Sequence, residues 1–293
     1  MDFDAFGALR DLMSVVKDLD ERLGGRPGPA GGAVVKARAA VTAFTAALST
    51  LPKEGPVDRA VAQQVARAHA SAILDVTFGG EIVITHGDVS PRDDAPTRDA
   101  FERLVTMMDG SVSWALYWAS RGGDALLDAG DAPEADVMAT LAHVLPLDLV
   151  ETLFFRRGAL RYALVCSLRD SKDEQADAVA PALVSVCKAA SDVLDKVFLV
   201  RRTLGRKPDL DEPNALVDAD MYSSAHVLAL AYLFEMRFWA RELDAAGRAV
   251  DLYCELVEDP KAPLHQAGWQ LGRAHEIRAR MATLAAGGEI KVE

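Results

Sequence analysis

The chain is 293 residues long, with 50% hydrophobic and 26% charged residues, which is the composition of an ordinary globular protein. Its 32 basic and 44 acidic residues leave a formal net charge of −12, which disfavours a nucleic-acid partner because such a partner needs a dense basic face. The acidic N-terminus does not resemble a secretory signal, and no apolar stretch is long enough to span a membrane. The three cysteines are widely spaced. We therefore expect a cytoplasmic protein without disulfides or a membrane partner.

The first 75 residues are predicted to form three helices. Apolar residues recur at alternating steps of three and four over residues 9–23 and again over residues 34–51, so each series would line one helix face. Glycines and prolines separate the two series, and we expect the two helices to fold back as an antiparallel hairpin. A third helix would follow to about Leu74, which makes residues 1–75 a predicted N-terminal helical unit.

Residues 76–96 interrupt the helical pattern and are predicted to form an irregular or β-containing loop. The β-branched run at residues 82–85 follows two glycines that would close a tight hairpin, so we expect a minor β-hairpin or strand near residues 76–85. The tail, residues 287–293, repeats the GGEI sequence of this region. It would either pair with the strand or form a loose terminus.

Residues 97–293 return to helical spacing and are predicted to form the main helical body, either as a domain of its own or continuous with the rest. Asp99 and Glu102 resemble a capping box at its first helix. Prolines and glycine pairs divide the remainder into successive helices. The sequence therefore predicts an all-α fold, an antiparallel array of about nine or ten helices with the minor β element described above.

The long connection at residues 76–96 is the first candidate binding surface, because helix-to-helix connections usually need only a few residues. The string THGD at residues 85–88 resembles the catalytic loop of aminoglycoside-phosphotransferase-like kinases. Helical patterns precede it where those enzymes have a nucleotide-binding lobe, so a turn is the preferred interpretation. The polar end of the connection offers four candidate binding side chains: His86, Asp88, Asp93 and Asp94.

Two tryptophans one helical turn apart are the second candidate. Trp114 and Trp118 would lie on one face of a helix, with Tyr117 between them in the sequence. Aromatic side chains at such positions usually belong to the core. The alternative is an aromatic-lined ligand pocket of the kind found between helices.

An acidic segment at residues 124–136 is the third candidate. It holds five carboxylates and no basic residue, so it would attract a basic partner. The alternative interpretation is a solvated loop whose acids cap and stabilise the following helix. The residues of this predicted acidic surface are Asp124, Asp128, Asp131, Glu134 and Asp136.

The sequence contains none of the familiar patterns of helical enzymes. We find no complete DDxxD cluster, no Glu-x-x-His pair and no closely spaced histidines, and so predict no catalytic residue, no metal site and no cofactor. The preferred function is a non-catalytic interaction, adaptor or assembly protein that binds a protein partner, including itself, through helical seams or strand addition at residues 82–85. The alternative is an all-α enzyme or small-ligand sensor that uses the 76–96 loop and the aromatic pocket.

Overall fold

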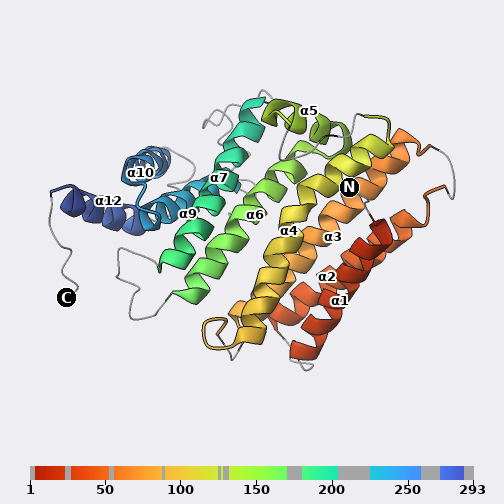
Figure 1. Ribbon diagram of the computed structural model, residues 1–293, viewed down its shortest axis with the longest axis horizontal. Coiled ribbons are helices and arrows are strands. Elements are labelled where there is room, and N and C mark those ends of the chain that lie inside the picture. Colours follow the sequence, from red (N-terminus) through yellow and green to blue (C-terminus); the bar gives the residue numbers. More distant parts are fainter. Residues whose placement is uncertain are drawn as a thin grey trace. The chain divides into compact units, whose positions relative to one another are not determined.

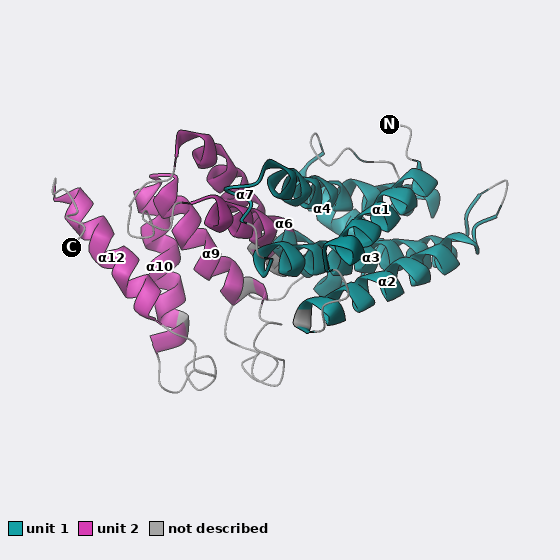
Figure 2. Cartoon of the chain, turned by 90° about the horizontal axis from the view of Figure 1, so that it is seen from below, with its two compact units in different colours: residues 1–156 teal, residues 157–293 magenta. Residues whose placement is uncertain are grey.

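The computed structural model is an all-α protein, as the sequence predicts. It describes residues 4–23, 28–52, 56–87, 90–124, 127, 132–169, 180–203, 225–258 and 271–286. These residues form ten helices, within the predicted number, and they contain no strand. None of the described helices combines the length and apolar character needed to cross a membrane. The chain divides into two compact units, residues 1–156 and 157–293 (Figure 2).

Unit 1 contains five complete helices that pack largely in chain order (Figure 1). Helix α3 is central: it packs against α1, α2, α4 and α5, while α1 also contacts α2, and α5 also contacts α4. The five helices are α1 (Ala5–Leu23), α2 (Pro29–Leu48), α3 (Arg59–Thr85), α4 (Ala95–Arg121) and α5 (Glu134–Val144).

The first two helices bury the faces that their spacing predicts. Helix α1 buries Leu12, Val16 and Leu19, and α2 buries Val41 and Phe44. Each fully buried side chain of this size stabilises the fold by about 1.5–3 kcal/mol relative to an exposed one, so these two faces hold the α1–α2 hairpin on α3. The predicted hairpin is therefore present, with both helices packed on a third.

Unit 2 contains four complete helices and the C-terminal part of α6, the helix in which the boundary between the units falls. Helix α9 packs against α7, α10 and α12, and α10 also contacts α12. Gly158 of α6 allows a close approach to α7, because a Cβ atom there would lie 2.4 Å from Leu194 Cγ. The helices are α6 (Leu147–Leu168), α7 (Pro181–Thr203), α9 (Ala225–Trp239), α10 (Leu243–Glu258) and α12 (Gly272–Ala285).

The predicted β-hairpin near residues 76–85 is wrong, because these residues are the last turns of α3. The two glycines serve helix packing instead of a turn. A Cβ atom on Gly79 would lie 3.3 Å from the Ala33 carbonyl oxygen of α2, and one on Gly80 would lie 2.5 Å from Leu104 of α4. Val83 is buried, so the β-branched run contributes a helix face to the core. Strand addition at residues 82–85 is likewise wrong, because the backbone there is helical and its N–H groups donate within α3.

The connection between α3 and α4 is consequently shorter than predicted and runs from His86 to Asp94. Helix α4 begins at Ala95, before the predicted capping box, because the Asp94 side chain accepts a hydrogen bond of 2.9 Å from the Thr97 backbone N–H. The C-terminal tail, residues 287–293, lies outside the described residues.

Candidate functional site

A buried histidine lies at the centre of an aromatic cluster in unit 1. His69 of α3 is only 2% exposed and stacks on Phe44 of α2, with ring centroids 4.4 Å apart and planes 3° from parallel. Trp114 of α4 packs edge-on against the same His69 ring, with ring centroids 5.1 Å apart. Trp118 of α4 donates an indole N–H hydrogen bond of 3.2 Å to His69 Nδ1. The two predicted tryptophans thus share one histidine.

This hydrogen bond sets the chemical state of His69. Because Nδ1 accepts from the indole of Trp118, the ring proton of the neutral imidazole is on Nε2. Burial lowers the pKa of His69 to about 3, since the charged imidazolium would lose its hydration. His69 is therefore a neutral hydrogen-bond donor near neutral pH, and too weak a base for efficient proton transfer.

A cavity of about 270 Å³ lies between α1, α3 and α4, with His69 in its wall. Its lining combines apolar and aromatic surface with the charged residues Asp11 and Arg103. Arg103 also forms an ion pair of 3.3 Å with Asp18. The described lining residues are Ala8, Asp11, Leu12, His69, Ile73, Arg103, Thr106, Met107, Gly110 and Trp114. A mainly apolar cavity with a few polar groups is the usual form of a small-molecule site.

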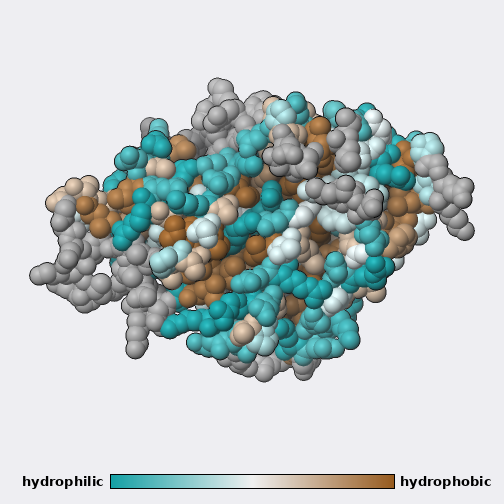
Figure 3. All heavy atoms as spheres, in the orientation of Figure 1, coloured by the Kyte–Doolittle hydropathy of each residue, from teal (hydrophilic) through white to brown (hydrophobic). Residues whose placement is uncertain are grey.

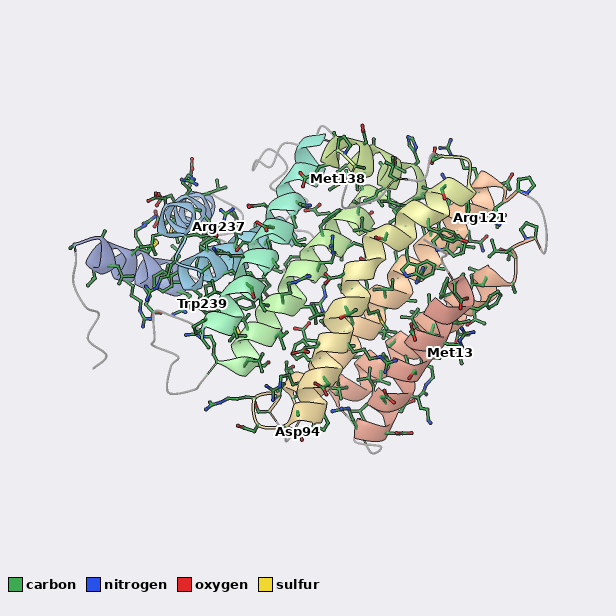
Figure 4. All side chains as sticks on the ribbon, in the orientation of Figure 1. Met13, Asp94, Arg121, Met138, Arg237 and Trp239 are labelled. Carbon is green, nitrogen blue, oxygen red and sulfur yellow. The ribbon has the colours of Figure 1, made fainter. Side chains whose placement is uncertain are left out.

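Asp94, at the end of the α3–α4 connection, lies far from the two tryptophans. Asp94 precedes α4, and Trp114 comes twenty residues later, so about 30 Å of helix separates them. Figure 4 shows Asp94 at one end of α4 and Arg121 at the other. The structure therefore does not join the connection and the tryptophans into one site.

Within the connection, the candidate side chains have different surroundings. His86 is exposed, with Nδ1 3.1 Å from the Ile82 carbonyl oxygen. Asp93 is exposed, whereas the Asp94 carboxylate caps α4, and its hydrogen bonds to Thr97 lower its pKa. Asp88 lies outside the described residues.

The predicted acidic surface is only partly described. Asp124 pairs with Arg59 at 2.9 Å and lies 3.3 Å from His143 Nδ1, so its carboxylate connects parts of unit 1. Glu134 and Asp136 are exposed in the first turn of α5, where negative charge complements the helix dipole. Asp128 and Asp131 lie outside the described residues.

Unit 2 holds a second aromatic cluster that the sequence does not predict. Tyr162 of α6 stacks on Tyr232 of α9, with ring centroids 4.1 Å apart, and lies 5.9 Å from the Trp239 ring. The Arg169 guanidinium lies 4.2 Å from the Trp239 ring centroid. Arg237 and Trp239 are on opposite sides of α9 (Figure 4). The cluster joins residues far apart in the sequence, which helical spacing alone does not reveal.

Two ion pairs flank α9. Glu235, buried on α9, accepts hydrogen bonds of 3.1 and 3.3 Å from Arg273 of α12, in a two-point arrangement. Arg237 of α9 pairs with Asp195 of α7. These contacts bind α9 to α7 and α12 by charge as well as by apolar packing.

The comparison with known proteins links part of the chain to an interaction family. Residues 131–259 match the model of the family described as RAB7A-interacting MON1-CCZ1 complex subunit 1. The match covers less than half of the chain. No curated protein and no solved structure matches the chain.

The segment that resembles this family runs from just before α5 to the end of α10. It includes the Tyr162 stack and the Glu235 carboxylate, but not the cavity beside His69, whose lining comes from α1, α3 and α4. The cavity and the family resemblance therefore concern different parts of the chain.

Proposed function

We propose that this chain is a non-catalytic interaction subunit that binds a MON1-CCZ1-type complex together with a RAB7A-type GTPase. The observation that carries the proposal is the match of residues 131–259, because the description of that family names these proteins as partners. The proposal assigns the binding surface to this segment.

The surface of the matched segment supports the proposal. Apolar residues reach the surface over the lower ends of α6 and α7 (Figure 3). Four apolar side chains there are only partly buried, namely Leu168, Leu183, Val184 and Val186. On α10, Leu252 is 41% exposed between the exposed acids Asp251 and Glu255. Apolar side chains surrounded by polar ones are typical of protein–protein interfaces.

The experiment measures binding of the purified full chain to the host organism's RAB7A and MON1-CCZ1 proteins. Isothermal titration is carried out with the GTPase in its GDP and GTP-analogue forms, and with the MON1-CCZ1 complex alone. We expect specific binding to at least one of these proteins. Absence of binding to all of them would refute the proposal.

A matched pair of variants locates the surface. Leu252→Asp replaces an exposed apolar residue inside the matched segment, and Met13→Asp replaces one that is 55% exposed on α1, outside it. Loss of a central apolar contact costs about 1–2 kcal/mol or more, so Leu252→Asp is expected to weaken binding about tenfold and Met13→Asp to leave it unchanged. The reverse result would assign the surface to α1.

A second candidate function, small-ligand binding, is favoured by the cavity beside His69. The neutral imidazole would offer its Nε2 proton to an acceptor, and Trp114 would contact a flat apolar group. A library of small planar compounds is screened by the quenching of tryptophan fluorescence. Saturable quenching that Trp114→Ala abolishes and Trp239→Phe retains would support a ligand site, whereas no saturable quenching would argue against it.

The α3–α4 connection and self-association are proposed as additional contact modes. His86 and Asp93 are exposed and available to a partner, while Asp94 has a capping role. Light scattering on the purified chain measures its mass. A mass equal to one chain at all concentrations would exclude self-association.

A further inference from the structure

Three side chains with metal-binding chemistry converge between α10 and α12. Cys254 and Glu258 lie four residues apart on α10, and His275 lies on α12, which packs against α10 (Figure 1). Their ligand atoms all lie within 4.8 Å of one another. Cys254 is buried, and the Glu258 and His275 side chains are about half exposed.

The distances are close to those of a tetrahedral zinc site. Zinc bonds of about 2.0–2.3 Å to nitrogen, oxygen and sulfur place neighbouring ligand atoms about 3.3–3.6 Å apart. Glu258 Oε1 and His275 Nε2 lie 2.9 Å apart, so this pair would open by about half an ångström. The most distant pair would close by at most about 1.2 Å from the 4.8 Å limit. Exposed glutamate and histidine side chains can make such movements by small rotations.

We propose that Cys254, Glu258 and His275 form a binding site for a divalent transition-metal ion, with Zn²⁺ as the ion that fits best. Sulfur and imidazole ligands favour zinc over magnesium and calcium, which prefer oxygen. Three protein ligands leave the remaining coordination position to solvent, which reaches the site through the exposed Glu258 and His275. On binding, the Cys254 thiol proton passes to solvent and the thiolate sulfur bonds to the metal.

The surroundings of the site are compatible with a cation. Arg278 of α12 is close enough to influence Cys254, but its guanidinium donates to Asp251 at 2.8 Å. The Arg278 charge is therefore partly balanced by Asp251, which lies about two helical turns before Glu258 on α10. The alternative is that no ion binds here, because Glu258 and His275 already form a hydrogen-bonded pair. That hydrogen bond lowers the pKa of Glu258. Titration with a metal ion separates these two states.

The full chain, stripped with a chelator and kept reduced, is titrated with Co²⁺ and then with Zn²⁺. Cobalt is the probe because its thiolate complexes absorb in the near ultraviolet and its tetrahedral complexes absorb visible light. We expect one Co²⁺ per chain, a thiolate charge-transfer band, and displacement of both signals by Zn²⁺. Zinc should also raise the unfolding temperature, because a ligand that binds only the folded state stabilises it.

Variants identify the ligands. Cys254→Ser should abolish the charge-transfer band, and Glu258→Gln and His275→Gln should each weaken binding by at least about tenfold, since even indirect metal partners are worth 10–100-fold. Because Glu258 and His275 are exposed, these two variants should fold normally, which circular dichroism checks. The matched controls, Cys166→Ser and His86→Gln, change the same residue types at exposed positions elsewhere and should bind as the natural chain does.

Three results would overturn the metal site. These are no saturable cobalt band, a band that survives Cys254→Ser, or equal losses in the control variants. The partner-binding proposal is independent of all three, because it is measured with other proteins and rests on the family match.

Discussion

Because His69 is buried and neutral, we expect the stability of the fold to depend on pH. The proposed change is His69→Gln, which removes the titrating ring but keeps a side-chain oxygen that can accept the indole N–H of Trp118. In the natural chain, the pKa of His69 falls from 6.5 in a solvated ring to about 3 in the fold. Between these two values the unfolded chain binds a proton that the folded chain does not, so acid favours unfolding.

The magnitude follows from the two pKa values. At pH 7 His69 is mostly neutral in both the folded and the unfolded chain, so its titration changes the free energy of unfolding by close to zero. At pH 5 His69 is protonated in the unfolded chain but not in the folded chain. This difference lowers the free energy of unfolding by about 2 kcal/mol. Stability is therefore retained above pH 6.5 and lost progressively as the pH falls toward 3.

The assay is urea unfolding at pH 7 and pH 5, followed by tryptophan fluorescence. Between pH 7 and pH 5, the free energy of unfolding should fall by about 2 kcal/mol more in the natural chain than in His69→Gln. The effects of the other titrating groups are common to both chains. His86→Gln, at an exposed histidine of the α3–α4 connection, is the control and should behave as the natural chain does. Equal losses in the natural chain and His69→Gln would show that His69 is not held neutral, and would refute the reasoning.

Two further predictions compare matched positions. Asp94→Ala removes the N-terminal cap of α4 and should lower the free energy of unfolding by about 1 kcal/mol, whereas Asp93→Ala, at an exposed neighbour, should change it by less than about 0.5 kcal/mol. Gly158→Ala places a methyl group against α7 and should destabilise by about 1–3 kcal/mol. Gly247→Ala meets nothing within 4 Å on α10 and should stabilise by about 0.5–1 kcal/mol, because alanine favours the helix. Thermal unfolding measures all four, and equal effects within either pair would contradict the packing described above.

The sequence predicts the helical fold well because the buried face of a helix is visible in the spacing of nearby apolar residues. The steps of three and four along α1 and α2 correspond to buried faces, since residues three or four apart lie on the same side of a helix. The error at residues 76–85 has the opposite origin. β-branched residues and two glycines favour a hairpin locally, but packing of α3 between α2 and α4 overrides that preference.

A cluster of side chains was predictable from the sequence only where its members lie on the same helix. Trp114 and Trp118 share a turn of α4, so their association is visible in the sequence, whereas His69 reaches them from α3. The same limit applies to Cys254 and His275, which belong to different helices. No fixed spacing records a contact between helices, because it depends on how they pack.

The central position of α3 in unit 1 bears on how that unit opens and folds. Its amide groups lie beneath four other helices, so their hydrogens should exchange with solvent only when most of the unit opens. Helices α2, α3 and α4 are also consecutive, and each packs on the next. Such contacts close only short stretches of chain, which is typical of rapid folding, so unit 1 can assemble around α3 early, as the chain leaves the ribosome.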